Sequence, residues 1–205
     1  CEGERKNTLI IGKRAVGKSW ACRDLILRKK IPMTIVISPM ENNDSFYSKF
    51  MDKRFIFPKV TENLLNAIII HQRQKRQKRQ MSEKGKHEKC DTRMLIVFDD
   101  PFWMFKICRN SSSFKEIIFS KDYYNIEIIM ACQSSEFEYA DICERVMLTH
   151  DNNQQTNKRS HKYYGKMFPT LSDFDEALQK ITLTNNMMHH NEINYNMMVL
   201  DKNSS

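Results

Sequence analysis

Eight consecutive residues, from Gly12 to Ser19, follow the pattern G-x-x-x-x-G-K-[ST] without a gap. The two glycines allow a tight turn whose backbone N–H groups can point at phosphate oxygens. Lys18 can reach the β- and γ-phosphates of a nucleotide, and the Ser19 hydroxyl is suited to bind Mg²⁺. We therefore predict a site for ATP and Mg²⁺ formed by Gly12, Lys13, Arg14, Ala15, Val16, Gly17, Lys18, Ser19 and Trp20.

A chance match is the alternative interpretation of this pattern. From average residue frequencies, it arises by accident in roughly one chain of this length in a hundred. The chain contains 5 glycines, and two of them occupy the two positions that the motif requires. An apolar run at residues 7–11 precedes the pattern and a helical pattern follows it, as a phosphate loop requires. These features favour the functional interpretation.

Two adjacent carboxylates, Asp99 and Asp100, follow the apolar run from Met94 to Phe98. That run reads as a buried strand, and ligands bind at the carboxyl ends of parallel strands. We assign Asp99 to the metal and Asp100 to the base that accepts a proton from an attacking water. The alternative is a pair of carboxylates that opens a turn before Pro101. With a phosphate loop upstream, we favour the catalytic interpretation.

Gln133 ends another apolar run, residues 128–132. A glutamine at the end of a strand can orient the attacking water or sense the γ-phosphate, as it does in some GTPases. It can equally be a polar residue that ends a strand. From the residues alone the two interpretations stay open.

Short apolar runs alternate with helical patterns along the chain. We expect strands near residues 7–11, 33–37, 54–57, 94–98, 126–131, 146–148 and 197–200, and helices near 18–30, 62–70 and 172–180. Continuously apolar strands separated by helices are typical of a mostly parallel sheet with helices on both faces. The sequence thus predicts an α/β fold and a single domain over residues 1–205.

The order of these parts resembles a known family, the poxvirus-type virion DNA-packaging ATPases of large DNA viruses, which are related to the FtsK/HerA translocases. The resemblance covers nearly the whole chain. Besides the phosphate loop, the acidic pair and the strand before Gln133, it depends on three more specific segments. These are residues 36–41 with Asn43, Phe46 and Tyr47, residues 163–170 with Phe174, and residues 197–201.

This resemblance implies a RecA-like P-loop core in which the strand ending in Gln133 lies between the phosphate-loop strand and the acidic strand. Gln133 would then act with Lys18 and Asp100 in catalysis. The family also implies a ring, a hexamer, that threads double-stranded DNA and hydrolyses ATP between subunits. Further partners would be capsid or membrane-vertex proteins. The expected location is intracellular, at viral factories in the host cytoplasm or in the virion.

The chain departs from the family at two segments that usually carry arginines. An Asn-Gly-Arg-His-Tyr-like segment is replaced by residues 120–123, and an Arg-Ser-Asn-like segment is replaced by residues 140–142. Such arginines are candidates for supplying positive charge across a subunit boundary. Lys121 or Arg145 are candidate replacements, although lysine lacks the planar fork of arginine. The departures bear on the rate of hydrolysis more than on ATP binding.

A basic run follows the helix expected near residues 62–70. Its cations are Arg73, Lys75, Arg76, Lys78 and Arg79. With no apolar face after Ile70, we interpret residues 71–92 as a basic exposed loop or a helix extension. The cations could contact DNA phosphates without regard to sequence. For an isolated charge run, a solvated segment without a partner is the commoner outcome.

Composition sets outer limits on the function. The net charge is +8, from 33 Lys and Arg against 25 Asp and Glu, which favours an anionic partner such as nucleic acid. No apolar run approaches the ~20 residues that cross a bilayer, so we expect no membrane span. The 6 cysteines show no close metal-binding or redox spacing, which favours a reduced, intracellular protein. No apolar core follows Cys1, so we expect no secretory signal within this sequence, although a longer parent chain could carry one, or further domains.

Three functions remain open at this point. The leading one is an ATP-hydrolysing motor that translocates double-stranded DNA to package a viral genome. A small P-loop kinase for nucleosides or nucleotides is the second, although the basic run lacks the glycine-bounded lid expected of one. The third is a scaffold that binds nucleotide and DNA but hydrolyses ATP slowly, which the missing arginines support.

Overall fold

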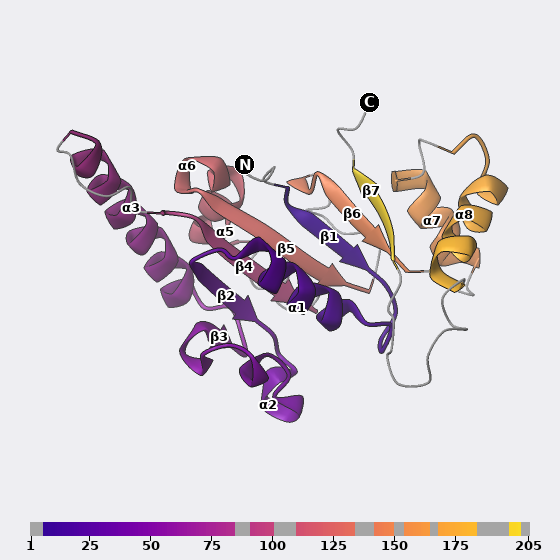
Figure 1. Ribbon diagram of the computed structural model, residues 1–205, viewed down its shortest axis with the longest axis horizontal. Coiled ribbons are helices and arrows are strands. Elements are labelled where there is room, and N and C mark those ends of the chain that lie inside the picture. The colour runs from indigo at the N-terminus through magenta and orange to yellow at the C-terminus, as the bar shows by residue number, and fades with distance from the viewer. Residues whose placement is uncertain are drawn as a thin grey trace. The chain divides into compact units, whose positions relative to one another are not determined.

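The computed structural model describes residues 6–84, 91–100, 110–133, 142–149, 154–164, 168–183 and 197–201 (Figure 1). Seven strands form one sheet. They are β1 (Thr8–Ile11), β2 (Met33–Ile37), β3 (Ile56–Phe57), β4 (Met94–Asp99), β5 (Ile126–Cys132), β6 (Arg145–Leu148) and β7 (Met198–Asp201). Hydrogen-bonded neighbours follow the order β3-β2-β4-β5-β1-β6-β7. The mostly parallel α/β sheet expected from the sequence is thus confirmed, and β7 pairs antiparallel with β6.

Seven α-helices accompany these strands in the described part of the chain. They are α1 (Lys18–Lys29), α2 (Glu41–Asp44), α3 (Glu62–Lys84), α5 (Ser112–Phe119), α6 (Lys121–Tyr124), α7 (Gln154–Tyr164) and α8 (Leu171–Leu183). Short 3₁₀ turns occupy Tyr47–Lys49 and Lys53–Phe55. The third expected strand therefore shrinks to β3, because its first residues form a 3₁₀ turn. None of the described helices is long and apolar enough to span a membrane.

The chain divides into two compact units. One contains the described residues up to Asp24 and from Ile129 onward, and the other contains Leu25–Ile128. In the first unit, β1 lies between the end of β5 and β6, with Ile11 opposite both Cys132 and Leu148. All four residues of β1 are buried, as expected for a strand with a neighbour on each side.

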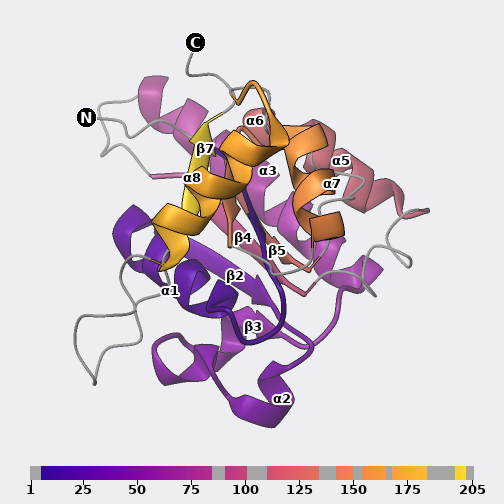
Figure 2. The ribbon, with the colours of Figure 1, turned by 90° about the vertical axis from the view of Figure 1, so that its right-hand side faces the viewer.

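Helices α7 and α8 lie side by side in the first unit (Figure 2). The ring of Phe174 on α8 packs at 5.4 Å from the rings of both His161 and Phe168. Thr170 caps α8 by accepting a hydrogen bond from the Asp173 N–H, while the Asp173 carboxylate accepts one from the Thr170 N–H. The segment that resembles the family at residues 168–174 therefore has a structural role, because it starts α8 and supplies its aromatic contacts.

A small ion-pair cluster joins both ends of the first unit's sequence. The Asp201 carboxylate on β7 accepts hydrogen bonds from Arg145 Nε at 2.9 Å and from Lys6 Nζ at 3.3 Å. The hydrogen bond from Arg145, followed by that from Lys6, holds the pKa of Asp201 below its usual value despite partial burial. Arg145 is the first residue of β6, whereas Thr149 directly follows the last residue of that strand, Leu148.

In the second unit, β2 pairs in parallel with both β3 and β4, with Val36 opposite Ile56 and Val97. All six residues of β4 are buried. Helix α3 begins after Thr61, whose side-chain oxygen accepts the Leu64 N–H at 3.2 Å. The helix continues to Lys84, so residues 71–84 extend it, and in Figure 1 its last turns reach away from β2 and β4. Gln72 anchors this extension because its amide donates to the carbonyls of Thr92 and Tyr124.

Candidate nucleotide-binding site

The phosphate loop connects β1 to α1 in the first unit. Residues 12–17 form this connection, and α1 begins at Lys18 with the Ala21 N–H bonded to the Gly17 carbonyl at 2.9 Å. Gly17 has φ 91° and Ala15 has φ 60°, so the chain turns through the left-handed region twice. A side chain at position 17 would be strained in this conformation. The loop therefore brings backbone N–H groups and a helix N-terminus together, which is how proteins bind phosphate.

Gly12 lies in a space that admits no side chain. A Cβ atom built on it would lie 2.3 Å from Thr149 Oγ1 and 2.7 Å from Val16 Cγ2. Backbone bonds fix this approach, since Gly12 N–H donates to the Cys132 carbonyl and Thr149 N–H donates to the Ile11 carbonyl, each at 3.1 Å. Thr149 thus shapes the start of the loop, a role that no motif in the sequence indicates.

A methyl group at position 12 is therefore expected to disrupt the loop. We predict that Gly12→Ala lowers the stability of the protein by about 1–3 kcal/mol, the usual cost of overpacking a close contact. It should also weaken ATP binding, because the methyl group pushes β6 and the loop apart. Thermal unfolding and fluorescence titration with ATP would measure the two effects.

The double variant Gly12→Ala with Thr149→Ala is the matched control. It removes the Thr149 side-chain atoms that crowd the new methyl group and leaves Val16 in place. We expect part of the lost stability to return, with Thr149→Ala alone close to the wild type. Equal losses in the single and double variants would contradict this account of Gly12.

Lys18 is 8% exposed, and its ammonium group donates a 2.6 Å hydrogen bond to the Lys13 carbonyl. The side chain therefore curls back over the loop that precedes it. Trp20 is 45% exposed, and the Arg23 guanidinium lies 5.2 Å from its ring centre. These residues provide a cation at the loop and an exposed aromatic ring one residue beyond Ser19.

Gln133 follows the last residue of β5 in the first unit. Cys132, directly before it, is the register partner of Ile11 and accepts the Gly12 N–H. Gln133 is exposed and directly follows the end of β5 that lies next to the start of the phosphate loop. The strand order β4-β5-β1 is also the order that the family resemblance implies.

The acidic pair ends β4 in the second unit. Asp99 is the last residue of the strand and is 8% exposed. Its Oδ2 atom accepts a 2.8 Å hydrogen bond from the Tyr47 hydroxyl. Asp100 has φ 56°, in the left-handed region, which Asp and Asn tolerate better than most residues. The turn that the sequence suggested before Pro101 falls on residues 101–109, which lie outside the described part of the chain.

The sequence did not predict the hydrogen bond between Tyr47 and Asp99. Tyr47 belongs to the 3₁₀ turn after α2, more than fifty positions before the acidic pair in the chain. A signal existed, because Phe46 and Tyr47 are among the residues that carry the family resemblance. Only the folded chain shows which polar group this tyrosine meets.

The cations of the basic run separate into two groups on α3. Arg73 donates to Glu116 and to the Tyr124 hydroxyl, and Arg76 lies 3.8 Å above the Tyr123 ring. These two arginines line a pocket of about 550 Å³ between α3 and α6, together with Gln77, Gln80, Ser120, Tyr123 and Tyr124. They therefore hold helices together in addition to adding charge.

The other cations of α3 influence a neighbouring histidine. Burial, and then the positive charges of Lys75 and Lys78, lower the pKa of His71 below its usual value. Lys78 and Arg79 are exposed, whereas Lys75 is half-buried. Positive charge is thus concentrated on this part of the helix.

The two candidates for the missing arginines also have contacts within the chain. Arg145 binds Asp201 at the end of β6 remote from Thr149, so it does not serve the phosphate loop of its own chain. Lys121 lies 3.5 Å from Asp122 at the start of α6. A role for Arg145 in a neighbouring subunit would require breaking its pair with Asp201. Residues 134–141, where the second departure begins, lie outside the described residues.

The mostly parallel sheet, its strand order and the phosphate loop between β1 and α1 define a RecA-like P-loop NTPase fold. The genome packaging NTPase B204 of Sulfolobus turreted icosahedral virus 2, in complex with sulfate, superposes with a TM-score of 0.60 at 14% identity. That comparison covers 98% of this chain and 93% of B204. The cytoplasmic domain of the Type VII secretion ATPase EccC of Thermomonospora curvata gives a TM-score of 0.55 at 12% identity, over 75% of this chain and 22% of EccC.

The curated relatives are viral proteins. Uncharacterized protein L437 of Acanthamoeba polyphaga mimivirus is 28% identical over 178 residues, covering 85% of this chain and 62% of L437. Uncharacterized protein 088R of Invertebrate iridescent virus 3 is 26% identical over 177 residues, covering 84% of this chain and 64% of 088R. The chain thus spans a little over three fifths of the length of these relatives. No model of a known protein family matches the chain.

Proposed function

We propose that this chain is an ATP-hydrolysing motor domain that translocates double-stranded DNA to package a viral genome into the virion. The observation that carries the proposal is the phosphate loop, with Gly12 fitted against Thr149 and Lys18 curled over the loop. The fold shared with the genome packaging NTPase B204, and the relatives encoded by viruses, support the choice of motor.

Each predicted site residue has a role in this proposal. The loop N–H groups and Lys18 bind the β- and γ-phosphates, and Ser19 and Asp99 hold Mg²⁺. When bound, Mg²⁺ neutralises charge on the phosphate oxygens. Asp100 accepts a proton from water as the water oxygen bonds to the γ-phosphorus. The bond from that phosphorus to the β–γ bridging oxygen breaks, and ADP leaves. Gln133 orients the water.

Oxygen ligands at Asp99 suit Mg²⁺ because this ion usually binds through one or two carboxylates together with substrate phosphates. Asp99 is the last residue of a fully buried strand, so the sheet sets the position of its backbone. Trp20, beside Ser19, is exposed enough to contact the nucleotide. We infer that the residues present fit ATP with Mg²⁺.

The proposed partners follow from the motor. They are double-stranded DNA, further copies of this chain in a hexameric ring, and capsid or membrane-vertex proteins. The proposed DNA contacts are the five cations of the basic run on α3, with Arg73 and Arg76 also supporting the helix. They are Arg73, Lys75, Arg76, Lys78 and Arg79. The proposed location is the viral factory in the host cytoplasm, or the virion.

Steady-state ATP hydrolysis with and without double-stranded DNA tests the proposal. We expect DNA to stimulate turnover, and replacing Lys75 and Lys78 with Ala to weaken DNA binding. Because each phosphate contact contributes about 0.9 to the slope of log K against log salt, the double variant should lower that slope by about 2.

Lys53→Ala with Lys59→Ala is the matched control, since it removes two exposed lysines from the same unit and changes the net charge equally. Its DNA affinity should stay within a factor of about two of the wild type. ATP binding without any stimulation by DNA would argue against the motor and for the scaffold. An equal loss of DNA affinity in both double variants would remove α3 as the contact surface.

A further inference from the structure

The hydroxyl of Tyr47 is buried together with the carboxylate that it contacts. Tyr47 is 1% exposed, and its hydroxyl donates a 2.8 Å hydrogen bond to Asp99 Oδ2. Its ring packs edge-on against Phe46, with centroids 5.1 Å apart, and against Phe50 at 5.8 Å. Phenylalanine could make these ring contacts equally well. The hydroxyl is therefore the part of Tyr47 that packing does not explain.

A hydrogen bond to one carboxylate oxygen limits the rotation of the carboxylate. Asp99 lies at the end of β4, and its bond to Tyr47 fixes the direction in which its oxygen atoms point. Mg²⁺ requires nearly octahedral ligands at about 2.0–2.1 Å, so a rotating carboxylate binds it poorly. Groups that orient metal ligands in this way commonly change metal affinity about 10–100-fold when they are removed.

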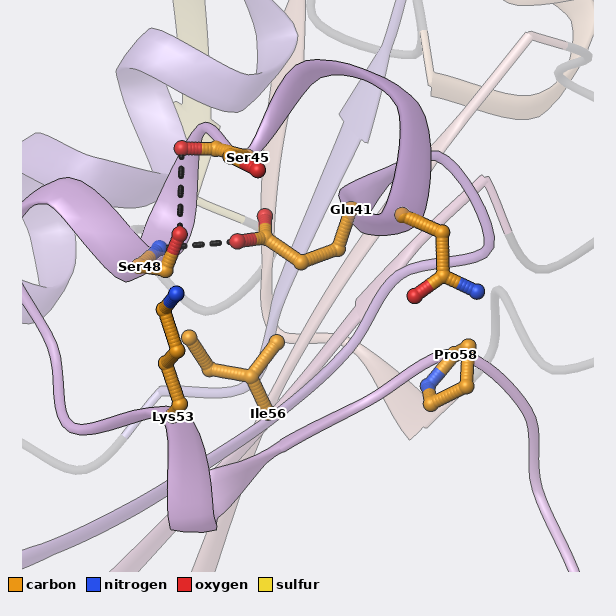
Figure 3. Close-up of a pocket in the computed structure, with 7 residues that line it drawn as sticks. Glu41, Ser45, Ser48, Lys53, Ile56 and Pro58 are labelled. Atoms are coloured by element: carbon orange, nitrogen blue, oxygen red, sulfur yellow. Dashed lines mark hydrogen bonds between the residues drawn. The ribbon is translucent and has the colours of Figure 1, made fainter.

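Tyr47 is itself held by Glu41, the first residue of α2. One oxygen of the Glu41 carboxylate accepts the Tyr47 N–H at 2.8 Å, and the other accepts the Ser48 N–H at 2.9 Å. Figure 3 shows the Glu41 carboxylate directed at Ser48, whose hydroxyl bonds to the Ser45 carbonyl. Because a carboxylate accepts through both oxygens, it closes the turn from α2 to Tyr47 at two points.

This turn sits at the edge of a surface pocket of about 270 Å³. The lining residues are Glu41, Asn42, Ser45, Ser48, Lys53, Ile56 and Pro58. Glu41 thus lines this surface pocket and also holds the buried Tyr47. The Tyr47 hydroxyl in turn contacts Asp99. The segment that resembles the packaging family at residues 41–47 has a physical role in this connection.

We propose that Tyr47 is a positioning residue for the metal-binding carboxylate of Asp99, and that Glu41 holds Tyr47 in place. The proposal rests on the proposed function, in which Asp99 binds Mg²⁺. In this proposal Tyr47 acts through Asp99 and does not itself bind nucleotide or metal. It fixes the rotation of the Asp99 carboxylate before the metal binds. Less entropy is then lost when the carboxylate binds the metal, and the metal affinity is higher.

Binding of Mn²⁺ in the presence of a non-hydrolysable ATP analogue tests this role, and electron paramagnetic resonance measures the free ion. We expect Tyr47→Phe to weaken Mn²⁺ affinity about 10-fold. Binding of the analogue in EDTA should be unchanged, because no metal is present there. Glu41→Gln should act in the same direction, since an amide has one acceptor oxygen where the turn needs two. If Tyr47→Phe does not fold, the Mn²⁺ affinity of Glu41→Gln tests the positioning role instead.

Tyr124→Phe is the matched control, since Tyr124 also donates its hydroxyl to a carboxylate, that of Glu116. It should leave Mn²⁺ affinity unchanged. Mn²⁺ affinity equal to the wild type in Tyr47→Phe and Glu41→Gln would overturn the proposal. So would a matching loss of analogue affinity in EDTA, which indicates general damage. A wild type that binds the analogue but no Mn²⁺ would overturn the metal role of Asp99, and one that binds no analogue would overturn the proposed function itself.

Discussion

Asp100→Asn is expected to reduce ATP turnover about 10²–10⁴-fold, the usual contribution of a positioned general base. The amide cannot accept the proton of the attacking water, so kcat should fall while ATP affinity stays close to that of the wild type. Asn is also a good match for the backbone, because Asp100 has φ 56° and Asn is among the few residues common in that region. Lost activity would therefore reflect lost chemistry, and circular dichroism and thermal unfolding should match the wild type.

Asp44→Asn provides the matched control for this change. It makes the same replacement in the same unit, on an exposed residue at the end of α2. Its turnover should equal that of the wild type within a factor of about two. Full turnover in Asp100→Asn would contradict the assignment and move the search for the base to another group. Lost ATP binding in the same variant would indicate that Asp100 has a binding role instead.

The sequence was most informative where the structure depends on local rules. The phosphate loop, the buried run of β4 and the capped start of α3 follow from residues close together in the chain, such as Gly17 and Thr61. Their conformation is set by backbone freedom, strand burial and side-chain caps, each of which acts within a few residues.

The parts that the sequence did not predict depend on contacts between distant residues. Thr149 meets Gly12, and Tyr47 meets Asp99, only after strands and turns from distant parts of the chain come together. Helix α7 lacked an apolar pattern because two of its buried positions are polar, Asn157 and Ser160. Periodicity detects apolar faces, so it misses a helix whose buried side is partly polar.

The basic run on α3 also shows the difference between what local sequence and what distant contacts determine. Its composition indicated exposure and charge, and α3 does carry exposed cations at Lys78 and Arg79. Composition could not show that Arg73 and Arg76 face α5 and α6, because that depends on which side of the helix packs on its neighbours. The helix face therefore separates cations that the sequence presents as one group.

Lys18→Ala is expected to have the largest effect on nucleotide affinity. In the structure Lys18 is 8% exposed and its ammonium group bonds to the Lys13 carbonyl at 2.6 Å, so the cation already lies against the proposed phosphate loop. A hydrogen bond to a charged group contributes about 1.5–3 kcal/mol. Loss of this cation should therefore weaken ATP binding at least 10-fold, with a further loss of turnover because the same charge stabilises the transition state. Trp20 fluorescence in a Trp103→Phe background would report the binding.

Lys13→Ala and Lys18→Arg separate charge from position. Lys13 is exposed, and what it supplies to Lys18 is a backbone carbonyl that alanine retains, so Lys13→Ala should bind ATP nearly as the wild type does. Lys18→Arg keeps the charge but introduces a planar group that the tight loop does not accommodate, so its affinity should resemble that of Lys18→Ala. Equal affinity in Lys18→Ala and Lys13→Ala would mean that total positive charge binds the nucleotide. A loss confined to position 18 would mean that the loop holds one cation in one place, as a phosphate-transfer site requires.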